Sequence, residues 1–184
     1  GSGIKGAPVD LASGEFLKPR LKIATPAAST PKAVAAIVDE IADSFADDLP
    51  KYAPIGVTIP GVVQHGVVRT AANIDKSWID APGEEIFSQA LGRKCLLVND
   101  ADAAGVAEQR YGAAKGRSGL VVLTTLGTGI GIALIHNGVL IPNCEMGHIE
   151  LDGHDAETRA ASSAKEREGL KYREWAVQRL QPYY

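Results

Sequence analysis

The sequence has 184 residues, with 19 lysines and arginines against 22 aspartates and glutamates and a formal net charge of -3. This acidic balance argues against a protein that binds nucleic acid by neutralising phosphates along a basic face. Its 45% hydrophobic and 22% charged residues are typical of a globular protein, and its length predicts one domain plus a remainder.

No stretch approaches the ~18 uncharged apolar residues that span a membrane, and no signal-peptide pattern precedes the first predicted strand. Two cysteines, Cys95 and Cys144, are too few for a disulfide framework, so we expect reduced thiols. These features favour a cytoplasmic protein with no membrane partner.

The first half of the chain alternates short apolar runs with one long and one short helical pattern. Pro19 demotes the second run to an edge strand, because proline has no N–H to donate. Thr30 followed by Pro31 is typical of a helix start, with a capping hydroxyl before a proline at the first helical position. The predicted elements are strands at 4–11 and 15–25, a helix at 31–49, strands at 54–59 and within 62–68, a helix at 83–91 and a strand at 95–98.

The second half continues the alternation and then becomes charged and rich in alanine. Asn137-Gly138 is the strongest hairpin signal in the chain, because both residues tolerate the left-handed backbone that a tight two-residue turn needs. Alternating strands and helices predict an α/β fold with a mixed sheet. The predicted elements are a small-residue helix at 101–111, strands at 120–126, 130–136 and 139–141, and helices at 156–168 and 172–180.

A glycine-rich turn follows a buried strand in the segment 124–131. Its glycines let backbone N–H groups approach phosphate oxygens, and Thr128 adds a hydroxyl donor. The turn is not a dinucleotide-binding motif, because its third glycine comes one residue early and a strand follows it. It is not a P-loop, because no Gly-Lys-Ser/Thr closes it. The residues alone leave a phosphate-binding turn and an ordinary glycine hairpin open.

Asn99-Asp100 stands at the end of another buried strand. Open α/β sheets bind ligands beyond the carboxyl ends of their strands, so a carboxylate here suits a base that takes a proton from a sugar hydroxyl. Asn99 can bond to neighbouring hydroxyls. The alternative is a helix N-cap for 101–111, a position that Asn or Asp would fill equally well, and the residues by themselves favour it.

The polar segment 144–155 begins with Cys-Glu-Met-Gly-His. Glu145 can accept hydrogen bonds from sugar hydroxyls, and His148 can donate or accept them. A metal site is the rival interpretation, although a lone thiol without paired spacing supports zinc poorly. A plain polar loop also fits. The metal site would use Cys144, His148, Asp152 and His154.

Three further features carry less information. Pro60-Gly61 ends a strand in a turn that offers backbone groups to a ligand, although most such pairs are only turns. Lys5, beside Ser2 and Gly3, is either a ligand-binding cation or a surface lysine. The cations of the last helices alternate with glutamates, which favours a salt-bridged solvent face.

Together and in this order, these motifs resemble the ROK family of sugar kinases in the actin-like ATPase superfamily. The likeness is greatest to the family's branch of bacterial polyphosphate glucokinases. Residues 1–10 resemble the end of the family's first phosphate motif, and 126–131 resemble its second. The other matching segments are the sugar-side turn at 58–61, the following segment at 72–74 with Trp78, the catalytic segment at 99–105 and the glucose-binding Glu-x-Gly-His at 145–148.

The resemblance implies an actin-like (ribonuclease H-like) fold of two lobes with mixed sheets and flanking helices, 1–98 and 99–184. It implies that Asp100 is the catalytic base. The implied sugar-binding residues are Pro60, Gly61, Asn73, Asn99, Asp100, Glu145, His148 and Glu157. The implied phosphate-binding residues are Ser2, Gly3, Lys5, Thr125, Gly127, Thr128 and Gly129.

The sequence departs from the family's pattern in two ways. Typical members follow the histidine with a cysteine-rich zinc motif, where this chain has 153–157 and a charged helix. We therefore expect no zinc, and in the resemblance this points to the polyphosphate branch, with Glu157 as the second sugar-binding carboxylate. The family's first strand with its leading aspartate and its last Gly-Gly segment are not found, so we expect both ends of the fold to be absent from these 184 residues.

The function that the resemblance implies is phosphoryl transfer from polyphosphate, ATP or both to the 6-hydroxyl of glucose, with mannose as a second candidate acceptor. Mg²⁺ would accompany the donor, and a homodimer is implied by the resemblance alone. The alternative is a sugar-sensing protein of the same family without phosphotransfer; the acidic charge and the lack of a basic helix-turn-helix region disfavour it. A phosphate-releasing hydrolase of the actin-like class is a third hypothesis, which the sugar motif disfavours.

Overall fold

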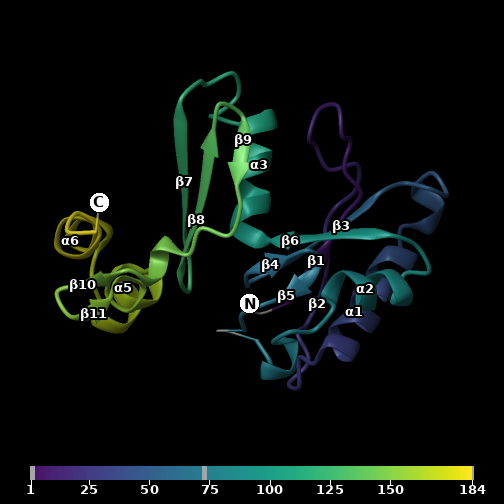
Figure 1. Ribbon diagram of the computed structural model, residues 1–184, viewed down its shortest axis with the longest axis horizontal. Coiled ribbons are helices and arrows are strands. Elements are labelled where there is room, and N and C mark those ends of the chain that lie inside the picture. The colour runs from purple at the N-terminus through teal and green to yellow at the C-terminus, as the bar shows by residue number, and fades with distance from the viewer. Residues whose placement is uncertain (1–2, 72–73, 184) are drawn as a thin grey trace. The chain divides into compact units, whose positions relative to one another are not determined.

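The computed structural model describes residues 3–71 and 74–183 (Figure 1). The chain forms two compact units, 1–103 and 104–184, and the division between them falls inside helix α3 (Asp100–Tyr111). The lobes that the sequence predicts, 1–98 and 99–184, stay a prediction. Two predicted ligand contacts, Ser2 and Asn73, lie outside the described residues.

The first unit is built on short paired strands. β1 and β2 are antiparallel, β3 and β6 are parallel, and β4 and β5 form a small antiparallel pair joined by a turn at His65-Gly66. Their bounds are β1 Ile4–Gly6, β2 Leu21–Ile23, β3 Ile55–Ile59, β4 Val63–Gln64, β5 Val67–Val68 and β6 Cys95–Asn99.

The first two strands are much shorter than the predicted runs at 4–11 and 15–25. Beyond Gly6 the pairing is reduced to a single bridge between Val9 and Phe16. Pro8 and Pro19 interrupt both runs, and proline cannot donate to a ladder. The connection is instead a turn in which the Asp10 side chain accepts from the Ala12 N–H at 2.8 Å.

Two helices belong wholly to the first unit, α1 (Pro31–Asp43) and α2 (Gly83–Ala90). The predicted start of α1 is confirmed, because the Thr30 side chain accepts from the Ala33 N–H. The predicted end at 49 is wrong. The Ser44 hydroxyl donates to the Ile41 carbonyl at 2.7 Å and the chain leaves the helix, resuming only as the 3-10 turn η1 (Ala46–Asp48).

The core of the first unit is centred on Trp78, the last residue of the 3-10 turn η2 (Lys76–Trp78). Its side chain is 1% exposed and stacks on Phe87 with ring centroids 5.6 Å apart. Its indole N–H donates to the Ser29 carbonyl at 2.8 Å, so the buried polar atom is satisfied. The rest of this core is Ala35, Val57, Ile59, Val68, Ala71, Ala81, Cys95 and Leu97.

The second unit contains the antiparallel sheet β7 (Leu120–Leu126), β8 (Ile130–His136) and β9 (Val139–Ile141). The predicted hairpin is confirmed: His136 pairs with Val139, and Asn137 and Gly138 have φ of 50° and 81°. Helix α3 packs on one face of the sheet (Figure 1), where a Cβ on Gly105 would come 2.5 Å from that of Ala133. The small residues of this helix therefore allow its backbone to approach the sheet closely.

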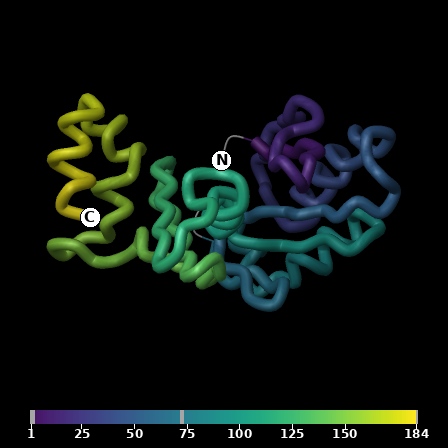
Figure 2. Tube along the Cα trace, turned by 90° about the horizontal axis from the view of Figure 1, so that it is seen from above, coloured from purple at the N-terminus to yellow at the C-terminus, as the bar shows by residue number. Residues whose placement is uncertain are grey.

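The end of the chain is a string of short helices on a small hairpin, which Figure 2 traces in yellow-green and yellow. The single helix predicted at 156–168 is wrong, because Ala161 adopts an extended backbone with φ -63° and ψ 160° and divides it in two. The elements are η3 (Met146–His148), β10 (Glu150–Leu151), β11 (His154–Asp155), α4 (Ala156–Ala160), α5 (Ser162–Glu168), α6 (Tyr172–Trp175) and the π-helical turn η4 (Ala176–Leu180).

Alternate side chains of β8 pack on opposite faces of the strand against different neighbours. Ala133 and Ile135 are fully buried on one face, whereas Ile130 and Ile132 pack with Ala160 and Ala161 of the C-terminal helices. Strand β8 thus carries the packing of the second unit. Within the described residues, no helix has both the length and the apolar content that crossing a membrane requires.

Candidate active site

The carboxyl ends of two parallel strands bring four of the predicted residues together in the first unit. Ile59 of β3 pairs with Asn99 of β6, so the Pro60-Gly61 turn and Asp100 both follow at the same edge. The Asn99 side-chain amide donates to the Gly61 carbonyl at 3.1 Å. This is the position at which parallel strands place ligand-binding groups.

Asn99 is also the N-cap of helix α3. Its side-chain oxygen accepts from the Ala101 N–H at 2.8 Å and from the Asp102 N–H at 3.0 Å. The residue is 8% exposed, so these bonds also satisfy a buried polar group. The cap hypothesis therefore holds for Asn99, and Asp100 is the residue presented beyond the cap.

Asp100 is accessible to solvent, but neighbouring protein atoms cover part of its carboxyl group. Partial burial raises the pKa of its carboxyl above the usual 3.8, and hydrogen bonding from the Ala101 N–H, 2.9 Å away, acts in the opposite direction. A carboxylate with a raised pKa is a stronger base than an ordinary surface aspartate. Asp100 therefore has the chemistry that a proton-accepting group needs.

The predicted phosphate residues at the start of the chain lie on or beside β1. Lys5 is exposed and stands opposite Lys22 in the β1–β2 pair, so two cations share this ribbon. Gly3 lies so close to Lys22 that a Cβ on Gly3 would come 2.6 Å from the Lys22 Cε. A larger residue at position 3 would displace the Lys22 side chain.

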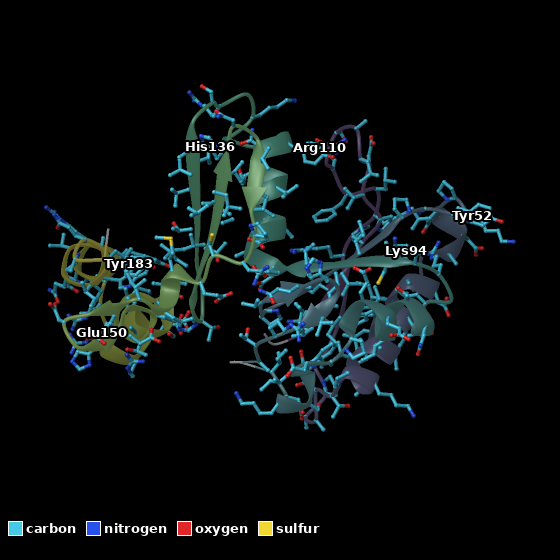
Figure 3. The ribbon with its side chains drawn as sticks, viewed as in Figure 1. Tyr52, Lys94, Arg110, His136, Glu150 and Tyr183 are labelled. Atoms are coloured by element: carbon cyan, nitrogen blue, oxygen red, sulfur yellow. The ribbon has the colours of Figure 1, made fainter. Side chains whose placement is uncertain are left out.

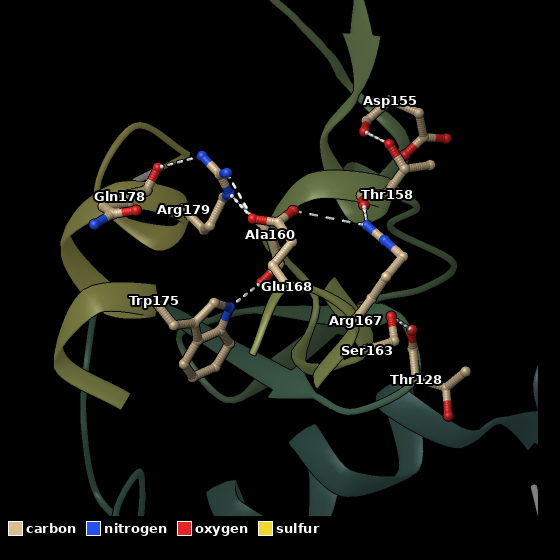
Figure 4. Close-up of polar contacts among 10 residues, drawn as sticks. All are labelled: Thr128, Asp155, Thr158, Ala160, Ser163, Arg167, Glu168, Trp175, Gln178 and Arg179. Atoms are coloured by element: carbon tan, nitrogen blue, oxygen red, sulfur yellow. Dashed lines mark hydrogen bonds and ion pairs between the residues drawn. The ribbon is translucent and has the colours of Figure 1, made fainter. Parts of the chain in front are cut away.

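In the second unit, the glycine-rich turn joins β7 to β8 and is held by helix α5. The Ser162 hydroxyl donates to the Gly127 carbonyl at 2.7 Å, and the Ser163 hydroxyl donates to the Thr128 carbonyl at 2.8 Å, as Figure 4 shows for the second pair. The Gly127 N–H bonds to the Gly129 carbonyl at 2.9 Å. Hydroxyl donors thus occupy two carbonyl oxygens that would otherwise repel an anion.

Thr125 lies just before this turn on β7. It pairs with Gly131 on β8, and its hydroxyl is 3.4 Å from the carbonyl oxygen of that glycine. Thr125 is exposed, so its side chain is accessible at the end of the strand.

Glu157 links the glycine-rich turn to helix α4. Its carboxylate accepts from the Ile130 N–H at 2.8 Å. The same carboxylate lies so close to Gly129 that a Cβ there would collide with it. The residue predicted to bind sugar is therefore also the residue that contacts the glycine-rich turn.

The Glu-x-Gly-His motif forms η3 and lies against the same part of β8. A Cβ on Gly147 would collide with the Ile130 carbonyl, so only glycine permits this approach. Glu145 precedes the turn, and the Tyr183 hydroxyl (Figure 3) donates to the Met146 carbonyl at 2.7 Å. The two predicted motifs of this unit are thus in direct contact.

The imidazole of His148 has a partner that the sequence did not reveal. Its Nδ1 lies 2.9 Å from a carboxylate oxygen of Asp155, and its side chain is 42% exposed. The hydrogen bond to Asp155 raises the pKa of His148 above the usual 6.5, and the charges of Glu157, Asp155 and Glu145 act in the same direction. Desolvation opposes this shift.

The rival metal interpretation gains no geometric support. Across the described residues, no three side chains of histidine, cysteine, aspartate or glutamate gather as a metal site would require. Cys144 directs its thiol to the Ile141 carbonyl at 3.3 Å, and Asp152 lies in the hairpin turn with φ of 52°. His148 is engaged by Asp155 instead.

The sequence reasoning missed Asp155, Ser162 and Ser163. Asp155 carried a signal, because an aspartate directly before a helical run is a typical N-cap. The two serines carried none, since they lie inside what appeared to be one continuous helix.

Known proteins share both the motifs and the fold. The ROK family profile matches residues 4–166. The chain belongs to the ROK family. The actin-like α/β fold expected from the motifs is confirmed by the structures that this chain resembles.

Three known proteins illustrate the likeness. A polyphosphate glucokinase of Mycobacterium tuberculosis is 54% identical over 97% of this chain and 66% of its own length. An inorganic polyphosphate/ATP-glucomannokinase of Arthrobacter sp. strain KM matches with a TM-score of 0.94 and 49% identity, over 100% of this chain and 73% of its own. A ROK family glucokinase of Streptomyces griseus, solved with glucose and AMPPNP, matches with a TM-score of 0.78 and 27% identity, over 90% and 56%.

The ROK chain described by these 184 residues thus spans about two thirds of its mycobacterial relative.

Proposed function

We propose that this protein is a glucokinase that transfers a phosphoryl group from polyphosphate, ATP or both to the 6-hydroxyl of glucose. The observation that carries the proposal is the position of Asp100, exposed beyond the N-cap of α3 and next to the Pro60-Gly61 turn. The relatives named as polyphosphate glucokinase and polyphosphate/ATP-glucomannokinase supply the substrate class.

Asp100 is the proposed base. Its carboxylate accepts the proton of the 6-hydroxyl as the oxygen attacks the terminal phosphorus of the donor, and the donor's remaining phosphate leaves in line. The raised pKa of Asp100 suits this role, because the affinity of a carboxylate for the proton rises with its pKa. Asn99 holds Pro60-Gly61 beside it, and both segments are proposed to contact the sugar.

The remaining candidate residues have two proposed roles, sugar binding and phosphate binding. Glu145, His148 and Glu157 bind sugar hydroxyls, because carboxylates accept and imidazole can donate or accept. Thr125, Gly127, Thr128 and Gly129 bind the donor phosphates through hydroxyl and backbone N–H groups, with Ser2, Gly3 and Lys5 as the second phosphate-binding segment. Asn73 is proposed as a further sugar contact.

Mg²⁺ is proposed to enter with the donor. Mg²⁺ in kinases is typically bound by substrate phosphates and only one or two carboxylates, and the described residues offer no gathered set of three acidic or imidazole ligands. The chain thus fits a metal that the donor brings rather than one held in a protein cage. When bound, the ion would neutralise phosphate charge. A homodimer, a cytoplasmic location and mannose as a second acceptor belong to the same proposal.

The test is the substitution Asp100→Asn. We expect kcat to fall by about 100-fold or more with either donor, because the amide cannot accept a proton, while glucose binding persists. The measurement is a coupled assay for glucose 6-phosphate, with polyphosphate and ATP supplied separately, together with calorimetry of glucose binding. The matched control is Asp43→Asn, which removes an exposed carboxylate at the last residue of α1.

Two results would overturn the proposal. Turnover that survives in Asp100→Asn would remove Asp100 as the base. Glucose binding by the unsubstituted protein without product from either donor would favour the sugar-sensing alternative.

A further inference from the structure

Asp155 is the last residue of the β10–β11 hairpin and the N-cap of helix α4. The turn of this hairpin is Asp152-Gly153, with φ of 52° and 74°, so it is the tight left-handed type. It pairs Glu150 with Asp155 and thereby returns the chain to the neighbourhood of His148. The Asp-Gly pair therefore decides where the Asp155 carboxylate lies.

The two oxygens of Asp155 have different partners. Oδ2 lies 2.9 Å from Nδ1 of His148, and Oδ1 accepts from the Glu157 N–H at 2.9 Å as the N-cap of α4. The Asp155 carbonyl also accepts from the Thr158 hydroxyl at 2.7 Å (Figure 4). One carboxylate is thus bonded to two residues that the proposed function assigns to sugar binding.

We propose that Asp155 is a positioning residue that fixes the tautomer of His148 and the place of Glu157, so that both present hydrogen-bond acceptors to the sugar. The proposal rests on the proposed function only for the identity of the sugar ligand. The geometry that carries it lies wholly within the second unit.

The tautomer follows from the chemistry of the carboxylate. A carboxylate only accepts hydrogen bonds, so Nδ1 of His148 must carry the proton and Nε2 of the neutral ring is left as an acceptor. The side chain is 42% exposed, so a ligand can reach the ring. A sugar hydroxyl would then donate to Nε2, as it would to the carboxylate of Glu157.

The substitution Asp155→Asn separates positioning from mere support of the fold. Asparagine caps helices as well as aspartate does, so α4 keeps its first turn. Its single oxygen is then taken by the Glu157 N–H, and its NH₂ group faces His148. Because NH₂ donates, the substitution favours the opposite tautomer, with the proton on Nε2, and it removes the charge that raises the pKa of His148.

The first measurement is the NMR titration of ¹⁵N-labelled imidazole nitrogens without ligand. In the unsubstituted protein we expect the neutral His148 to carry its proton on Nδ1. In Asp155→Asn we expect a lower pKa and the proton on Nε2. The matched control is Asp152→Asn, which removes a carboxylate from the same hairpin at a left-handed position that asparagine tolerates, and it should leave His148 unchanged.

The second measurement is kinetic. We expect Asp155→Asn to raise the KM for glucose by about tenfold, since the sugar hydroxyl loses its acceptor at Nε2 of His148, and to lower kcat much less. An unsubstituted His148 with its proton on Nε2, or a pKa and tautomer that are the same in Asp155→Asn, would overturn the proposal. The NMR readout needs no turnover, so failure of the glucokinase proposal is distinguishable from failure of this one.

Discussion

At the scale of single residues, two titratable groups have pKa values raised for different reasons. Burial raises the pKa of the Asp100 carboxyl because low polarity disfavours the charged form. A hydrogen-bonded carboxylate raises the pKa of His148 because it favours the charged form. The raised pKa makes Asp100 a stronger base, and the hydrogen bond to Asp155 restrains the His148 ring.

The pKa of Asp100 predicts the acid side of the pH profile. A base acts only when it is ionised, so kcat/KM should fall as the pH drops through the raised pKa, at a pH above the usual aspartate value of 3.8. The measurement is kcat/KM for glucose from neutral pH downward, at saturating donor. An acid limb of the same pKa in the residual activity of Asp100→Asn would assign the titration to another group.

At the scale of elements, the glycine-rich turn between β7 and β8 is stabilised by the helices that follow it in sequence rather than by its own strands alone. Ser162 and Ser163 donate to its carbonyls, and Glu157 accepts from the first N–H of β8. This arrangement depends on the break at Ala161, which gives α5 a new start beside the turn. Because the helix is divided in two, residues of both α4 and α5 form hydrogen bonds with the turn and with the start of β8.

The glycines of the turn test this packing. In Gly129→Ala the new Cβ would displace the Glu157 carboxylate and break its hydrogen bond with the Ile130 N–H, so we expect a loss of about 1–3 kcal/mol in the free energy of unfolding. Gly127→Ala is the matched control for stability, because a Cβ there meets no atom within 4 Å. Chemical denaturation of both variants measures the difference. Equal midpoints would show that Glu157 moves away at no cost.

At the scale of the whole molecule, each unit has its own core and its own buried tryptophan. Trp78 is 1% exposed in the first unit. Trp175 is 7% exposed in the second, where its indole N–H donates to the Ala160 carbonyl at 2.9 Å (Figure 4). The sequence contains two tryptophans, so each reports on one unit.

The fluorescence of these two tryptophans allows the unfolding of each unit to be followed separately. We expect Phe87→Leu to lower the denaturation midpoint reported by Trp78 more than that reported by Trp175, because Phe87 stacks on Trp78 in the first core. The measurement is tryptophan fluorescence against urea in the single-tryptophan backgrounds Trp175→Phe and Trp78→Phe. Equal shifts in both would mean that the two units unfold as one.

Much of the fold was predictable because its signals are local. The cap at Thr30, the hairpin at Asn137-Gly138 and the strands predicted at 54–59 and 95–98, found as β3 and β6, follow from short patterns that fix the backbone nearby. Element ends were less predictable. The helix end at Asp43 and the break at Ala161 depend on a serine hydroxyl and on packing against β8, which no periodicity encodes.

The sequence by itself determined the family, the order of its motifs and the chemical types of the candidate residues, because these depend on residue identity and spacing. Only the tertiary structure decided which residues touch. It shows that Asn99 caps α3, that Glu157 bonds to the N–H that follows the glycine-rich turn, and that His148 bonds to Asp155. The physical reason is that such bonds join groups brought together by strand pairing and by short turns, and their geometry depends on the whole unit being folded.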